Sequence, residues 1–158
     1  MKIMTNEIHM FVIWHQATQF FNIILQQIEA VAEILDVIQY TCNIRNAITI
    51  QQKLYNISFE EAREKCKNGN FDVFIVIIVR LKHSIYIMAS THWGTARVEK
   101  HMYTIKNTLR EQLNSPYGIH STIDEKEAEH DIQAMTGKKS SYYANHSVWN
   151  KEMKEINL

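Results

Sequence analysis

Cysteine, glycine and proline are scarce in this chain of 158 residues, which contains two cysteines, four glycines and one proline. The two thiols, Cys42 and Cys66, are too few for a disulfide framework and too far apart for a cysteine-rich zinc site. We therefore expect both cysteines to be free in a reducing compartment. No linker divides the chain, and it contains no internal repeat or low-complexity segment.

A surplus of charge is absent as well, because 17 basic residues balance 17 acidic residues. Proteins dedicated to nucleic acid carry a basic surplus for their phosphate contacts, so this balance disfavours a nucleic-acid partner. A local basic pocket for one nucleotide remains compatible with it.

Long hydrophobic runs are also missing. The longest, residues 71–81, is interrupted by Asp72 and Arg80, whereas a membrane-spanning helix needs about 20 apolar residues. Residues 1–7 lack the basic start, apolar stretch and small-residue cleavage site of a signal peptide. These absences predict a cytoplasmic protein without a membrane partner.

Hydrophobic residues make up 46% of the chain, which is enough for one buried core. We expect a single domain over residues 1–137, followed by a tail over residues 138–158 that holds a helix near residues 148–156. Apolar periodicity predicts strands at residues 8–14, 36–42, 71–81 and 84–89, of which the last two form a hairpin. It predicts helices at residues 16–35, 43–56, 58–67, 98–113 and 124–135.

This order of elements is that of a ferredoxin-like antiparallel sheet covered by helices on one side, which is an α+β fold. Such a fold hosts many functions. An RNA-binding module of this kind would present aromatic side chains from its central strands. Residues 71–81 are instead rich in Ile and Val, so we rank RNA binding last.

One histidine, His120, stands in a context suited to phosphate chemistry. It follows the turn at residues 114–118 and precedes a predicted helix, whose free N–H groups attract anions. A phosphate-accepting histidine needs a neutral ring with one nitrogen free, a carboxylate on the other nitrogen, and donors for the phosphoryl oxygens. Asp131, eleven positions later, and Thr122 are candidates for the carboxylate and for one donor.

Residues 107–132, NTLREQLNSPYGIHSTIDEKEAEHDI, resemble the signature region of the nucleoside diphosphate kinases. The TLR step is similar to the family's Thr-Ile-Arg, the IHST step to Ile-His-Gly-Ser, and the HDI step to Lys-Glu-Ile. The spacing from histidine to carboxylate is the same. Residues 95–98, TARV, resemble the family's Thr-Gly-Arg-Val, and the likeness extends over residues 8–137.

The resemblance implies a nucleoside diphosphate kinase-like phosphotransferase that passes a phosphoryl group through His120. Asp131 would orient the ring of His120, and Thr122 would assist as a hydroxyl. The residues that would hold the nucleotide phosphates are Arg97, Arg110, Thr104 and His15. The resemblance also implies a nucleoside di- or triphosphate or another phosphate ester as partner, Mg²⁺ bound with the nucleotide, and assembly into a homo-oligomer.

One family residue has no counterpart in this chain. The family's first strand runs into Lys-Pro-Asp, whose lysine contacts the phosphate, whereas residues 12–16 are Val-Ile-Trp-His-Gln. The alternative function is therefore a catalytically inactive nucleotide-binding or protein-interaction scaffold. We expect no metal site at His92, His101 and His120, because their spacings of 9 and 19 residues match neither a helix face nor a zinc knuckle.

Overall fold

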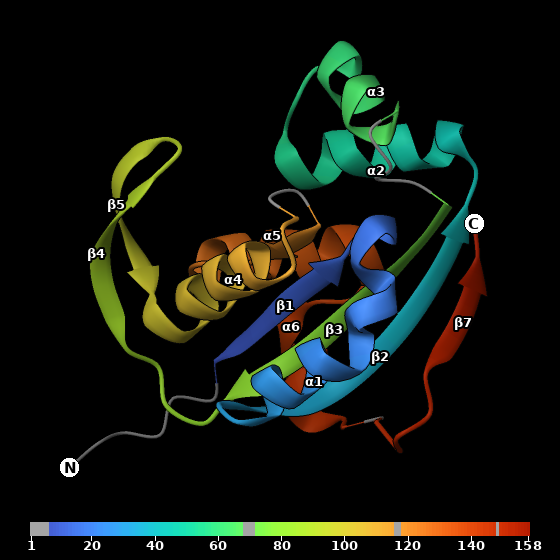
Figure 1. Cartoon of the computed structure of the whole chain (residues 1–158). Coiled ribbons are helices and arrows are strands. Elements are labelled where there is room, and N and C mark those ends of the chain that lie inside the picture. Colours follow the sequence, from blue (N-terminus) through green and yellow to red (C-terminus); the bar gives the residue numbers. More distant parts are fainter. Residues whose placement is uncertain (1–6, 68–71, 116–117, 148) are drawn as a thin grey trace.

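The computed structural model describes residues 7–67, 72–115, 118–147 and 149–158. Its centre is a five-stranded sheet in the order β6-β1-β3-β2-β7 (Figure 1). The strands are β1 (Ile8–Ile13), β2 (Ala32–Cys42), β3 (Asp72–Leu81), β6 (Ile119–Ser121) and β7 (Lys154–Asn157). β1 pairs antiparallel with β3 and with β6, and β2 pairs antiparallel with β3. This arrangement of β6, β1, β3 and β2 is ferredoxin-like, which confirms the predicted α+β fold class.

Helices cover both faces of the sheet, rather than the one face that we predicted. The core of one face contains residues from η1 (His15–Phe20), α1 (Phe21–Glu29) and α4 (Lys100–Gln112). The core of the other face contains residues from α2 (Ile44–Tyr55), α3 (Phe59–Lys67), α5 (Glu125–Thr136) and α6 (Ser140–Asn145). Because both faces are covered, every residue of β1 is buried, and β1 is apolar except at His9.

The predicted hairpin between residues 71–81 and 84–89 is wrong. β3 has β1 on one side and β2 on the other, so neither of its edges is free for a further strand. β4 (Tyr86–Thr91) pairs instead with β5 (Gly94–Glu99), in a two-stranded sheet that lies beside α4 (Figure 1). The tight turn from Thr91 to Gly94 is possible because Gly94 adopts a φ of 101°.

The helix predicted over residues 16–35 is too long. It begins as η1, continues as α1 and ends at Glu29, and β2 begins at Ala32. Residues 31–35 fit the helical spacing, but β2 pairs with β3 from Ala32 opposite Leu81 to Cys42 opposite Asp72. This pairing of a long strand overrides a local periodicity.

Helices with complete local start and stop signals lie close to their predicted positions. The hydroxyl of Ser58 accepts a hydrogen bond from the backbone N–H of Glu61 at 3.2 Å, at the start of α3. Asp124 caps α5 by accepting from the N–H of Glu127 at 2.7 Å, and Gly137 ends this helix at a φ of 72°.

The C-terminal segment does not form the helix that we predicted near residues 148–156, although residue 148 itself lies outside the described residues. β7 is a strand, and it pairs parallel with β2 at residues 38–41. Before it, α6 places Tyr143 in the same core as β1, with 1% of the residue exposed. The chain after α5 therefore packs against the sheet. No helix in the described part of the chain is long and apolar enough to cross a membrane.

Deletion of residues 154–158 tests the pairing of β7. The backbone N–H of Leu158 donates to the carbonyl of Thr41 at 2.8 Å, and Lys154 Nζ lies 3.4 Å from a carboxylate oxygen of the buried Asp36. Loss of both contacts should lower the free energy of unfolding by about 2 kcal/mol. Amides of residues 38–41 that face β7 should exchange faster with solvent, whereas those that face β3 should keep their protection. Unchanged exchange across these residues would contradict the pairing.

Candidate active site around His120

The short strand β6 places His120 at the edge of the sheet. His120 lies opposite Val12 of β1, on the face covered by α5, and 7% of the residue is exposed. β6 is also held by Arg110 of α4, whose Nε donates to the backbone carbonyl of Ile119 at 2.9 Å. The position of the ring is therefore set by the sheet and by one neighbouring helix.

Asp131 of α5 contacts one nitrogen of this ring. His120 Nε2 lies 2.9 Å from Asp131 Oδ2, and Asp131 is 1% exposed. Among the residues that the structure describes, none forms a hydrogen bond with Nδ1 of His120. A neutral ring that donates from Nε2 carries its lone pair on Nδ1. Burial lowers the pKa of His120, against the opposing effect of Asp131, and this favours the neutral ring.

The second oxygen of Asp131 is occupied as well. His130 Nδ1, from the same helix, lies 2.8 Å from Asp131 Oδ1, and the side chain of His130 is 58% exposed. With both oxygens bound to imidazoles, the carboxylate of Asp131 is fixed in orientation.

One aromatic residue that we did not predict contacts the ring of His120, and a second aromatic residue holds it in place. The ring of Tyr55, the last residue of α2, meets it edge-on, with centroids 5.0 Å apart and an interplanar angle of 81°. Trp14 Nε1 donates a hydrogen bond to the hydroxyl of Tyr55 at 3.0 Å. Trp14 is buried directly after β1, so this side of the site is largely apolar.

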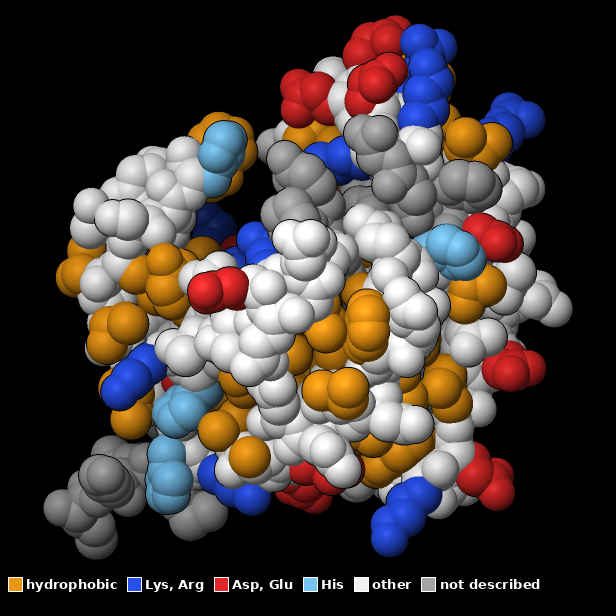
Figure 2. All heavy atoms as spheres, in the orientation of Figure 1, with side chains coloured by type: hydrophobic (Ala, Val, Ile, Leu, Met, Phe, Trp, Pro, Cys, Tyr) orange, Lys and Arg blue, Asp and Glu red, His pale blue; other side chains and the backbone are white. Residues whose placement is uncertain are grey.

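Positive charge reaches the site from α3 and α4 instead. Lys106 and Arg110 lie one helical turn apart on α4, and both lower the pKa of His120. Lys65 of α3 lies over the ring of Tyr55, with Nζ 3.9 Å from the centroid, and burial and then the charge of Arg110 lower the pKa of Lys65. Burial and then Arg110 lower the pKa of Lys106 to about 8. Figure 2 shows Lys and Arg side chains in the hollow between the β4–β5 hairpin and the α2–α3 pair.

A second carboxylate, Glu127 of α5, lies close to His120. Its Oε1 is 3.6 Å from His120 Nε2, and its side chain is 32% exposed. Burial and then the charge of Asp131 raise the pKa of Glu127 to about 7. His120, Glu127 and Asp131 are also the described residues that could hold a metal ion, because their ligand atoms all lie within 4.8 Å of one another. His92 lies against Trp93 instead, and His101 contacts Glu99.

The Thr122 hydroxyl and the Arg97 guanidinium have partners other than the ring of His120. The Thr122 hydroxyl lies 2.8 Å from Nδ1 of His9 and accepts from the N–H of Met10 at 3.1 Å. Arg97 lies over the ring of Tyr86, 3.5 Å from its centroid. The hydroxyl of Tyr86 in turn donates to the carboxylate of Glu7. Glu7 precedes β1 and lies about 17 Å along the strand direction from Val12, the residue that pairs with His120.

Thr104 and His15 are not brought to the ring either. Thr104 is exposed on α4, and the helical repeat turns it away from the side that carries Lys106 and Arg110. His15 is exposed at the start of η1, and its carbonyl accepts from the Thr18 hydroxyl at 2.9 Å. Of the four phosphate-binding residues that we predicted, Arg110 is the one that the structure brings to His120.

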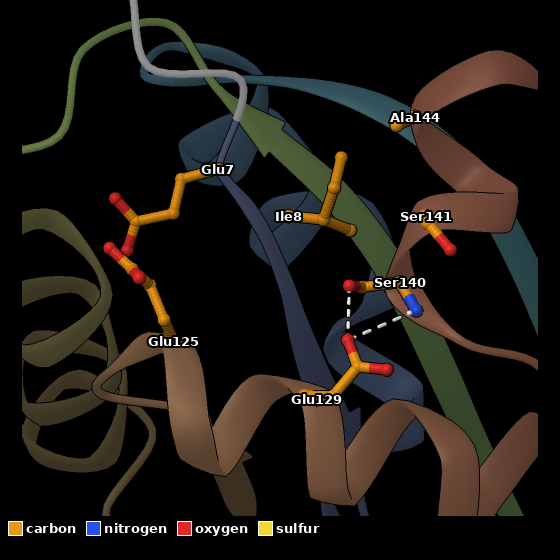
Figure 3. Close-up of a pocket in the computed structure, with 7 residues that line it drawn as sticks. All are labelled: Glu7, Ile8, Glu125, Glu129, Ser140, Ser141 and Ala144. Atoms are coloured by element: carbon orange, nitrogen blue, oxygen red, sulfur yellow. Dashed lines mark hydrogen bonds between the residues drawn. The ribbon is translucent and has the colours of Figure 1, made fainter.

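A separate cavity of about 570 Å³ lies between the start of β1, α5 and α6 (Figure 3). Its lining includes the carboxylates of Glu7, Glu125 and Glu129, and Glu129 accepts hydrogen bonds from the backbone N–H and the hydroxyl of Ser140. These carboxylates would repel a phosphate ester. The charges around His120 therefore suit a phosphate ester better than the charges of this cavity do.

No family model matches the chain, and no curated protein matches its sequence. Its structure is similar to the crystal structure of the nucleoside diphosphate kinase of Aquifex aeolicus, with a TM-score of 0.52 and 10% sequence identity. The match covers 82% of this chain and 94% of that one. At this identity it shows the fold alone, so the chain has a nucleoside diphosphate kinase-like fold.

The raised pKa of Glu127 predicts how stability depends on pH. Between its ordinary pKa of 4.5 and about 7, the folded protein keeps a proton that the unfolded chain has released, so the free energy of unfolding falls as pH rises through this window. Glu127→Gln removes this dependence and should gain about 3 kcal/mol relative to the parent protein across the window.

Urea denaturation at several pH values measures this difference. Glu125→Gln, a substitution at an exposed residue in the first turn of the same helix, is the matched control. The free energies of unfolding of the parent and of Glu125→Gln should differ by nearly the same amount at every pH. If the difference between the parent and Glu127→Gln is also independent of pH, the described environment of Glu127 is contradicted.

Proposed function

We propose that the chain binds a nucleotide or another phosphate ester beside His120, and that Nδ1 of His120 accepts a phosphoryl group. The observation that carries this proposal is the contact between His120 Nε2 and Asp131 Oδ2 at 2.9 Å, in a buried site flanked by Lys106 and Arg110. This contact keeps the proton on Nε2 and the lone pair on Nδ1, as a phosphate-accepting histidine requires.

In the proposed step, the lone pair of Nδ1 forms a bond with the terminal phosphorus of the donor. The bond from that phosphorus to the bridging oxygen breaks, and its electron pair leaves with the nucleoside diphosphate. The ring becomes cationic, and its Nε2 proton remains in the hydrogen bond to Asp131, whose negative charge stabilises the product. Transfer to a second phosphate ester reverses these bond changes.

The cations supply what the phosphoryl oxygens need. Lys65, Lys106 and Arg110 reach the site from α3 and α4, and they replace in charge the lysine that the family carries after its first strand. Fixed positive charges in a site with little water stabilise the charge of a transferring phosphoryl group. The excess of cations also favours an anionic ligand over a neutral one.

Magnesium belongs to this proposal as the companion of the nucleotide. Glu127 and Asp131 approach His120 from the Nε2 side, so neither lies beside the nitrogen that would accept the phosphoryl group. The Mg²⁺ would therefore be held chiefly by the phosphates, and it would neutralise part of their charge. In this proposal, the active protein is a homo-oligomer in the cytoplasm.

Labelling by ATP with a radioactive γ-phosphate tests the role of His120. The parent protein should acquire label that is lost in acid and retained in base, and His120→Gln should acquire none. His83→Ala, at an exposed histidine on the surface, should be labelled like the parent. Equal labelling of His120→Gln would remove His120 from this role.

Removal of positive charge tests the role of α4. Lys106→Met should slow labelling by at least about tenfold, because the transferring phosphoryl oxygens lose one fixed charge. Thermal unfolding with nucleotide and Mg²⁺ separates binding from transfer, since a ligand at about a hundred times its dissociation constant adds about 2.7 kcal/mol. Stabilisation without any labelling would identify the inactive nucleotide-binding scaffold instead.

A further inference from the structure

Three potential metal ligands meet on the Nε2 side of His120. They are Nε2 itself, Oε1 of Glu127 at 3.6 Å and Oδ2 of Asp131 at 2.9 Å, and all three lie within 4.8 Å of one another. Glu127 and Asp131 are four residues apart on α5, so one face of the helix presents both carboxylates. Zinc ligands lie about 2.0–2.2 Å from the ion, so the three atoms would close on it with shifts of less than about 1 Å.

The surroundings of these atoms suit a metal site. Asp131 is already oriented by His130, whose Nδ1 lies 2.8 Å from the other carboxylate oxygen, as is usual around metal-binding groups. Glu127 has a partly exposed side chain and can move toward an ion. An imidazole and two carboxylates form a mixed nitrogen and oxygen set, which favours Zn²⁺, Co²⁺ or Mn²⁺ over Mg²⁺.

We propose that a divalent transition metal ion, with Zn²⁺ the tightest binder of those named, is held by His120, Glu127 and Asp131, and that it switches off phosphoryl transfer. The second half of this inference rests on the proposed function. The ion would take the lone pair of Nε2, and the proton of the neutral ring would then sit on Nδ1. Metal binding and phosphoryl acceptance therefore require opposite tautomers of one imidazole, so they exclude each other.

The nearby cations give the metal site a distinctive response to substitution. Lys106 and Arg110 act on His120 electrostatically, and they would repel a metal ion as they attract a phosphate. Lys106→Met should therefore tighten metal binding by roughly tenfold while it slows labelling. A variant that had lost its fold would instead bind the metal ion more weakly and also be labelled more slowly.

Titration of the metal-free full-length protein with Co²⁺ alone tests the site. Tightly bound Co²⁺ with few ligands absorbs visible light, and the absorption should saturate at one equivalent and disappear when Zn²⁺ is added. Glu127→Gln, at a partly exposed side chain, should weaken binding by at least about tenfold, whereas Glu125→Gln should bind like the parent. Absent absorption, or unchanged binding in Glu127→Gln, would overturn the metal site.

Labelling by ATP and Mg²⁺ with one equivalent of Zn²⁺ tests the switch separately. The parent protein should lose its labelling, and Glu127→Gln should keep most of the labelling that it shows without Zn²⁺. If Zn²⁺ binds and labelling of the parent is unchanged, the switch is overturned. If the parent is not labelled even without Zn²⁺, the proposed function fails and takes the switch with it, while the Co²⁺ titration still decides the metal site.

Discussion

The candidate site depends on the pairing of β6 with β1. This pairing sets His120 opposite Val12 and turns its ring toward α5, where Asp131 meets Nε2. β6 comprises only residues 119–121, so its position also needs the hydrogen bond from Arg110 to Ile119. One arginine thus anchors the strand that carries the histidine and adds positive charge beside it. The geometry of the site is fixed by the sheet and by α4 before any ligand arrives.

Basic and acidic side chains reach His120 from different helices. Lys65, Lys106 and Arg110 come from α3 and α4, and the carboxylates of Glu127 and Asp131 come from α5. A site of this kind can attract an anion while it keeps a proton on the far nitrogen of the imidazole. The same separation explains how one ring could serve a phosphate ester or a metal ion in turn, but never both.

Local signals predicted the elements that depend on local structure. The caps at Ser58 and Asp124 fixed the starts of α3 and α5, and the spacing of eleven residues between His120 and Asp131 placed a carboxylate beside the ring. Signals that depend on tertiary pairing were missed. Residues 84–89 alternate like a strand, but the two edges of β3 were already taken, which no local pattern reveals. Tyr55 reaches His120 through packing between α2 and α5. Lys106 could have been found, because it precedes Arg110 by one helical turn.

The arrangement around His120 requires a neutral ring, with its proton on Nε2 and its lone pair on Nδ1. Proton–nitrogen NMR of the imidazole in the metal-free protein at about neutral pH tests it most directly, since protonated and unprotonated ring nitrogens have well-separated chemical shifts. We expect a protonated Nε2 and an unprotonated Nδ1 for His120, with both signals lost in His120→Gln. A proton on Nδ1 alone, or on both nitrogens, would contradict it.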